Sequence, residues 1–219
     1  IRRQRQMCIR DRGLPVPRNR NRRINNVNEE YIMNQWKLIN HTFKFREGDT
    51  DEKGGCTFIG GTWKDVTTDD LFKDRKVVLF SLPGAFTPTC SGQQLPMYDE
   101  LYSKFKAQGY DDVYCISVND AFVMNAWARD LSIKNVKMIP DGCGTFTRSM
   151  GMLINKPAQG FGMRSWRYAA VVKNGLIENW FEEPGLNNSS NDDDPYTVSD
   201  PEYVLQNTCL LYTSDAADE

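Results

Sequence analysis

Among the residues that could do chemistry, Cys90 has the most unusual surroundings. It follows the strand-like apolar run KVVLFSL, residues 76–82, and the turn PGAFTPT, and it stands where a helical pattern begins. The first turn of a helix has unpaired N–H groups and a partial positive charge, which favour the thiolate form of a cysteine placed there. Within the turn, Pro83 and Pro88 stiffen the backbone, and Thr87 offers a hydroxyl to a bound polar atom. Polar neighbours of this kind favour a reactive thiol over an ordinary core cysteine.

Other cysteine chemistries fit the sequence less well. A cysteine hydrolase needs an imidazole base, and the only histidine, His41, lies near the first expected strand and outside any recognisable motif. A dithiol or zinc site needs closely spaced cysteines, whereas the six cysteines stand far apart, at positions 8, 56, 90, 115, 143 and 209. Their irregular spacing indicates independent thiols in a reducing compartment. One-thiol redox chemistry remains, in which a thiolate attacks an O–O bond and becomes a sulfenic acid.

Alternating strand and helix patterns surround Cys90 and must position it. After the thiol, LPMYDELYSKFKAQG (95–109) repeats apolar residues at helical spacing and ends at a glycine. VYCISV (113–118) and VKMIPD (136–141) are typical of buried strands, and a helix that Asp120 can cap lies between them.

The remaining patterns complete the fold prediction. HTFKFRE (41–47) alternates like a half-buried strand, residues 48–61 are typical of a loop, and TWKDVTTDDLFKDR (62–75) carries a helix-start signal. Asn174-Gly175 predicts a β-hairpin, and Ser199 is expected to cap a last helix. The order of elements predicts an α/β domain with a central mixed β-sheet flanked by helices.

Composition restricts the classes of function. With 219 residues, of which 40% are hydrophobic and 26% charged, the chain suits a soluble globular domain. No apolar run approaches the roughly 18 residues of a membrane-spanning helix, so we expect no membrane association. Nine Arg and one Asp fall within residues 1–23, whereas the whole chain has a net charge of −2. The rest of the chain is therefore acidic, and we expect no nucleic-acid partner.

We expect one domain over residues 33–207, with Met33 as its natural start. Residues 1–32 are expected to be a disordered or non-native leader, and residues 208–219 a non-native tail. RQRQMCIRDR, within residues 1–12, and CLLYTSDAADE at the other end resemble peptides translated from the synthetic linkers of sequencing libraries. A transit peptide and a nucleic-acid-binding arm are two other interpretations of the basic leader. We expect a cytoplasmic protein, with organellar targeting left open by this leader.

Four segments together resemble one family. PGAFTPTCS, SVNDAFVMNAW, PDGCGTFTRSMGM and GFGMRSWRYAAVVKNG are similar, in this order, to the type II, peroxiredoxin-5-like branch of the peroxiredoxins. They most resemble the bacterial members in which a glutaredoxin domain follows. The resemblance spans about residues 42–205 and implies a thioredoxin-like fold that reduces hydrogen peroxide and organic hydroperoxides with a thiol. It also implies a homodimer, no bound cofactor or metal, and glutathione, glutaredoxin or thioredoxin as the external reductant.

The resemblance assigns roles to four residues. Cys90 is the peroxidatic cysteine, and Thr87 supplies the hydroxyl that contacts thiolate and peroxide. Pro83 shields the pocket and limits over-oxidation. Arg167, in SWRYAAVV, matches the family's arginine and would stabilise the thiolate and polarise the peroxide through fixed donors. Arg164 is a weaker candidate for that role.

The thiol that resolves the sulfenic acid is harder to assign. Some members carry a cysteine in the late loop, where this chain reads PGLNNSSNDDDPYT. Cys115 matches the position of a proposed resolving cysteine in plant-type members, whereas its apolar strand favours simple core packing. Cys143 is expected to be incidental. We therefore expect a one-cysteine cycle in which glutathione or glutaredoxin reduces Cys90. The alternative is a redox-sensing or chaperone-like binding protein on the same scaffold with little turnover.

Overall fold

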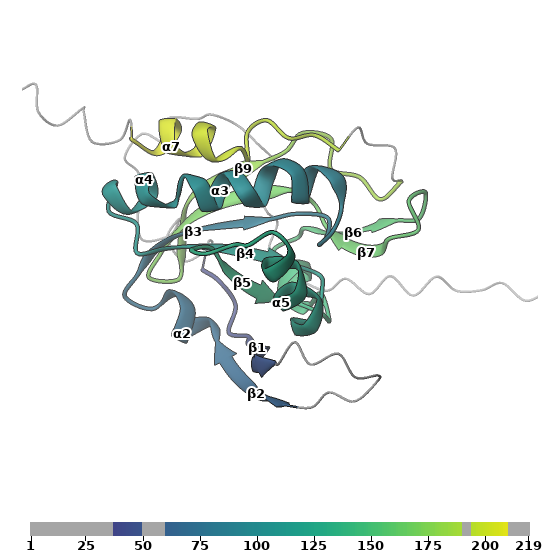
Figure 1. Cartoon of the computed structure of the whole chain (residues 1–219). Coiled ribbons are helices and arrows are strands. Elements are labelled where there is room, and N and C mark those ends of the chain that lie inside the picture. The colour runs from purple at the N-terminus through teal and green to yellow at the C-terminus, as the bar shows by residue number, and fades with distance from the viewer. Residues whose placement is uncertain (1–36, 50–59, 190–193, 210–219) are drawn as a thin grey trace, which may run out of the picture.

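The structure is a computed structural model, and it describes residues 37–49, 60–189 and 194–209 (Figure 1). The predicted non-native leader, residues 1–32, lies outside the described residues, as does the predicted tail beyond residue 209. Cys8 and Cys56 lie outside them too. The predicted start at residue 33 lies outside the described residues, whereas Thr208 and Cys209 continue the last helix, Pro201–Cys209, past the predicted end at residue 207. Both domain boundaries stay predictions.

A five-stranded mixed sheet forms the centre of the domain. In spatial order its strands are β5 (Lys137–Pro140), β4 (Asp112–Ser117), β3 (Lys76–Ser81), β8 (Tyr168–Lys173) and β9 (Leu176–Glu182). β4 pairs in parallel with both β3 and β5, whereas β8 pairs antiparallel with both β3 and β9. β4 is buried along its whole length, and β3 along all but its first residue, as continuous apolar runs predict. The predicted central mixed sheet is confirmed.

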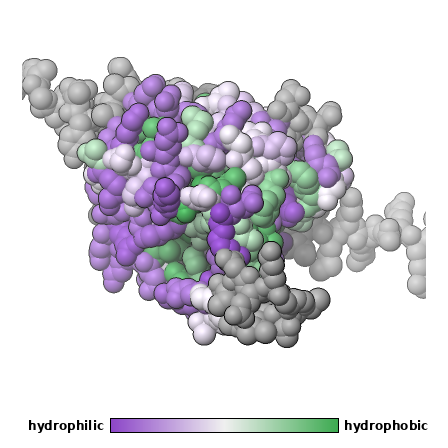
Figure 2. All heavy atoms as spheres, in the orientation of Figure 1, coloured by the Kyte–Doolittle hydropathy of each residue, from purple (hydrophilic) through white to green (hydrophobic). Residues whose placement is uncertain are grey.

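Helices cover both faces of this sheet (Figure 1). The first face carries η1 (Cys90–Gln94), α3 (Leu95–Glu100), α4 (Tyr102–Ala107), α5 (Ala121–Asp130) and α7 (Pro201–Cys209). The second face carries β1 (Thr42–Asp49), α2 (Thr68–Phe72) and α6 (Thr145–Ser149). Because side chains alternate along a strand, Val78 and Phe80 of β3 belong to the first apolar cluster, and Val77 and Leu79 to the second. The surface is mainly hydrophilic on the side of α2 and α4, and apolar atoms reach it nearer the middle of the view (Figure 2).

Three strands lie where the sequence patterns predict none. β2 (Gly60–Thr67) pairs with β1, and β6 (Leu153–Lys156) pairs with β7 (Gly162–Ser165), both antiparallel. Most residues of β2 and β7 are exposed or half-buried, so these strands lack the period-two apolar pattern that predicts a strand. The helix-start signal belongs to α2, which begins one residue after β2 ends and carries a capping box between Thr67 and Asp70.

The predicted hairpin is confirmed. Asn174 and Gly175 join β8 to β9 with positive φ values of 48° and 75°, as a tight hairpin turn requires.

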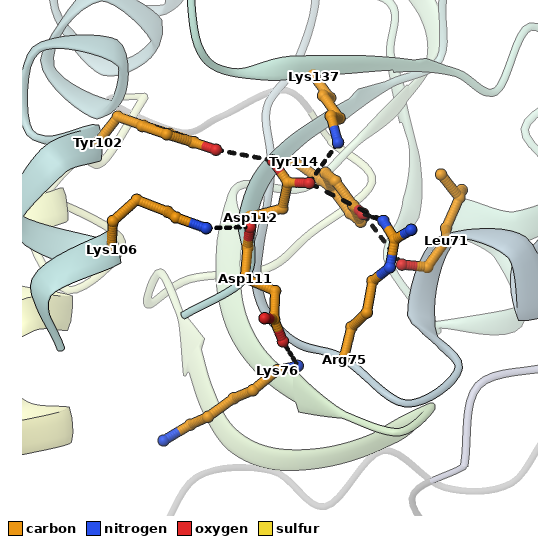
Figure 3. A network of polar contacts seen from close by, with 9 residues as sticks. All are labelled: Leu71, Arg75, Lys76, Tyr102, Lys106, Asp111, Asp112, Tyr114 and Lys137. Carbon is orange, nitrogen blue, oxygen red and sulfur yellow. Dashed lines mark hydrogen bonds and ion pairs between the residues drawn. The ribbon is translucent and has the colours of Figure 1, made fainter. Parts of the chain in front are cut away.

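A polar network holds the amino-terminal ends of the central strands together (Figure 3). The buried carboxylate of Asp112, at the start of β4, accepts a hydrogen bond from the Tyr102 hydroxyl at 3.0 Å and pairs with Lys137 Nζ. Arg75 Nη1 lies 3.9 Å from the same carboxylate and donates to the Tyr114 hydroxyl at 3.1 Å. The network therefore ties α4, β5 and the α2–β3 connection to β4, at the end of the sheet opposite Cys90.

Replacing Asp112 by Ala should lower the free energy of unfolding by about 2 kcal/mol, because the Tyr102 hydroxyl loses its acceptor and two cations lose their counter-charge. Urea denaturation measures this loss. Asp65→Ala is the matched control, since its pair with Lys44 is solvent-exposed and should contribute little. Equal losses in the two variants would contradict a structural role for the network.

Candidate active site

The site lies at the carboxyl end of β3, where β3 runs beside β8. Ser81, the last residue of β3, pairs with Tyr168, the first residue of β8. The loop that leaves β3 and the residue that precedes β8 are therefore neighbours. This register brings Arg167 to Cys90 across a sequence separation of 77 residues.

Cys90 begins η1, a short π-helical turn that continues into α3, as the predicted helix start requires. The Ser91 N–H donates to the Thr87 carbonyl at 2.9 Å, and the Leu95 N–H donates to the Cys90 carbonyl. Cys90 is fully buried, at 0% exposure, and belongs to the first apolar cluster. The thiol is thus shielded from bulk water, although its sequence neighbours are polar.

Pro83 and Thr87 lie in the turn that leads to Cys90. Pro83 is buried, and Thr87 is half-buried. Thr87 Oγ1 donates a hydrogen bond to the Gly84 carbonyl at 2.7 Å, which closes the turn. A hydroxyl that donates in this way keeps its lone pairs for a hydrogen bond from another molecule.

Two side chains outside the turn brace it. Asn119 Oδ1 accepts a hydrogen bond from the Ala85 N–H at 3.0 Å. Arg164 Nη1 donates to a main-chain carbonyl of the β4–α5 connection at 3.3 Å, and its Nε lies so near Gly84 that a Cβ atom there would come within 3.4 Å of it. Burial lowers the pKa of the Arg164 guanidinium. Arg164 therefore supports the turn, and Arg167 is the arginine that reaches the thiol.

The guanidinium of Arg167 lies beside the thiol of Cys90. Its Nη1 lies 3.6 Å from Cys90 Sγ, and the same nitrogen donates to Gln94 Oε1. Arg167 is only 1% exposed. Burial is the largest single influence and lowers the pKa of Arg167, but the charges of Cys90 and Asp194 and the hydrogen bonds to both residues together raise the pKa overall. A permanently charged donor beside a buried sulfur is suited to stabilise a thiolate and a transition state that carries negative charge.

Three residues around Arg167 were not predicted from the sequence to belong to the site. Gln94 lies one helical turn after Cys90, a spacing that could have identified it. Asp194 Oδ1 accepts from Arg167 Nη2 at 2.6 Å, and the Tyr196 ring centroid lies 5.5 Å from the guanidinium carbon. No sequence pattern connects these last two residues to Cys90, because only tertiary packing brings the 194–196 segment to the site.

Cys115 lies on β4, where it pairs with Phe80 of β3. It is fully buried in the same apolar cluster as Cys90. Burial first, and then the charge of Cys90, raise the pKa of the Cys115 thiol well above its ordinary value. A thiol that resists ionisation is a poor nucleophile, so this environment favours a packing role.

The described residues contain neither a cluster of three His, Cys, Asp or Glu side chains that could hold a metal ion nor a helix long and apolar enough to cross a membrane. Cys143 is exposed in the connection between β5 and α6.

Comparisons with known proteins place the chain in a family of known fold. The Redoxin family model matches residues 56–196. A peroxiredoxin of Rhizobium etli is 55% identical over 169 residues, which cover 77% of this chain and 91% of the relative. The hybrid peroxiredoxin hyPrx5 of Haemophilus influenzae is 49% identical over 170 residues, 78% of this chain and 64% of the relative. The solved structure of the Plasmodium falciparum antioxidant protein, a 1-Cys peroxiredoxin, gives a TM-score of 0.70 at 34% identity and covers 80% of this chain and 98% of that chain.

Replacing Arg167 by Gln should slow the reaction of Cys90 with hydrogen peroxide by at least about 100-fold, because the charged donor beside the sulfur is lost. Stopped-flow measurement of the second-order rate constant tests this. Arg148→Gln removes an exposed arginine of α6 and should leave the rate unchanged. A rate constant for the Arg167 variant within a few-fold of wild type would rule out this role.

Proposed function

This chain is a peroxiredoxin of the type II branch, and on that premise we propose that Cys90 is its peroxidatic cysteine. The family assignment, the thioredoxin-like fold and thiol-dependent peroxidase activity agree with the resemblance found in the sequence. One observation carries the assignment of Cys90: its sulfur lies 3.6 Å from the buried guanidinium of Arg167.

The reaction begins with the thiolate of Cys90. Its sulfur attacks the terminal oxygen of the hydroperoxide, so that an S–O bond forms while the O–O bond breaks. Cys90 becomes a sulfenic acid, and the remaining alkoxide or hydroxide takes a proton and leaves as alcohol or water. Arg167 Nη1 favours this step because its charge is already in place where negative charge develops.

The loop residues complete the proposed pocket. Thr87 lies in the turn before Cys90 with oxygen lone pairs that can accept a hydrogen bond from the incoming peroxide. Pro83, buried at the start of the same turn, restricts access of water and of a second peroxide to the sulfur. Hydrogen peroxide and organic hydroperoxides are the proposed substrates.

A one-cysteine cycle is the proposed route of reduction. A glutathione thiolate attacks the sulfenic sulfur, and hydroxide leaves and takes a proton to become water, which gives a mixed disulfide. A second thiol, from glutathione or glutaredoxin, then attacks the glutathione sulfur, forms a disulfide with it and releases reduced Cys90. The burial of Cys115 and its raised pKa support this route over an internal disulfide. Thioredoxin is an alternative external reductant.

We also propose that the enzyme is cytoplasmic and forms a homodimer. Phe86 supports the dimer, because it is 54% exposed on the active-site loop and its ring lies 6.5 Å from that of Trp127. An apolar side chain presented in this way suits contact with a second copy of the chain.

Cys90→Ser should abolish hydroperoxide consumption in a steady-state assay with glutathione and glutaredoxin, because a serine hydroxyl cannot replace the thiolate. Cys143→Ser removes the exposed cysteine of another loop and should keep wild-type turnover. Retention of turnover by the Cys90 variant would refute the assignment. Stable mixed disulfides with other proteins, together with negligible turnover of the wild type, would favour the redox-sensing or chaperone-like alternative.

After one equivalent of peroxide, mass spectrometry should find oxidation at Cys90 without a Cys90–Cys115 disulfide, because Cys115 lies buried and protonated on β4. Trapping with dimedone identifies the sulfenic acid. Detection of that disulfide in the wild type, and its loss in Cys115→Ser, would replace the one-cysteine cycle by an internal one.

A further inference from the structure

The two terminal nitrogens of Arg167 contact different partners. Nη1 faces Cys90 Sγ at 3.6 Å, whereas Nη2 pairs with Asp194 Oδ1 at 2.6 Å. The side chain of Arg167 is 1% exposed, so water contributes almost nothing to the solvation of its charge. A buried guanidinium needs charged or polar partners, because an unpaired buried charge is costly.

One of these partners changes charge during the proposed cycle. The proposed reaction starts from the thiolate of Cys90. After the sulfur has taken the peroxide oxygen, it is a neutral sulfenic acid, and it stays neutral as a mixed disulfide. Among the described neighbours of the Arg167 guanidinium, Asp194 then supplies the negative charge, while Gln94 supplies only a neutral acceptor.

A separate set of contacts fixes the segment that carries Asp194. The carboxylate of Glu183, fully buried just after β9, accepts hydrogen bonds from the N–H and hydroxyl groups of Thr197 and Ser199, at 2.7 to 2.9 Å. The Glu183 N–H donates in turn to the Arg167 carbonyl at 3.2 Å. The segment is thus anchored to the backbone of the arginine itself, through contacts that do not involve Cys90.

We propose that Asp194 is a positioning residue, the constant counter-ion that keeps Arg167 aligned while Cys90 is uncharged. This inference rests on the proposed function of Cys90 and extends it to the neutral stages of the cycle. The Tyr196 ring, 5.5 Å from the guanidinium carbon, covers the arginine from the same anchored segment. Asp194 therefore contributes most to the stability of the folded protein when the sulfur has no charge.

A double-mutant cycle tests this. Asp194→Asn is introduced into the reduced wild type and into Cys90→Ser, which holds a permanently neutral group at position 90, and the melting temperatures are measured at pH 8. The substitution should lower the melting temperature in the Cys90→Ser background by about 3 °C more than in the wild type, because only the wild type retains a thiolate partner for Arg167. Equal shifts, or a larger shift in the wild type, would overturn the inference. If Cys90→Ser does not melt cooperatively, Cys90→Ala supplies the same neutral state.

Two further variants make the test specific. Glu202→Gln removes an exposed acid of α7 and should shift the melting temperatures of both backgrounds equally. Asp194→Glu retains the charge and should reduce the difference between the backgrounds relative to Asp194→Asn. If the proposed function of Cys90 is wrong, the Cys90→Ser variant retains turnover. Loss of turnover together with equal melting shifts would reject the counter-ion inference alone.

Discussion

The burial of the Arg167 guanidinium is the constraint on which the site depends. A charge with 1% exposure is tolerable only where sulfur, oxygen and aromatic groups surround it, and two segments of the chain supply these groups. Cys90 and Gln94 come from the first turn after the active-site loop, and Asp194 comes from the late loop. Burial also holds the N–H donors of the arginine in a fixed orientation. Donors that are already oriented favour catalysis, because they need no reorganisation when negative charge develops on a substrate.

The central sheet brings Arg167 to this buried position. β3 and β8 are antiparallel neighbours, so the carboxyl end of one lies beside the amino end of the other, and the pair Ser81 and Tyr168 fixes that register. A shift by one residue would turn every side chain of β8 to the opposite face. The network around Asp112 holds the other ends of β4 and β5, far from the thiol. Stability and chemistry thus depend on opposite ends of the same strands.

Two carboxylates have different roles near the site. Glu183 is saturated by donors from Thr197 and Ser199, so it fixes the path of the backbone rather than the charge of the pocket. Asp194 is partly exposed and pairs directly with Arg167, so it changes the electrostatics that the sulfur meets. Together they explain how a loop far along the chain becomes part of a site built around one cysteine.

The sequence by itself determined the type of chemistry and the class of fold. The apolar runs of β3 and β4, the Asn174-Gly175 turn and the position of Cys90 before a helix depend on local patterns, which follow from backbone geometry and hydrophobic periodicity. The mostly exposed strands β2 and β7 lack such a pattern, and the tertiary fold alone decides that they pair. It alone also decides that Asp194 and Tyr196 surround Arg167 and that Cys90 is fully buried. Contacts of this kind depend on strand register and on loops that approach from distant positions, and neither has a signature in adjacent residues.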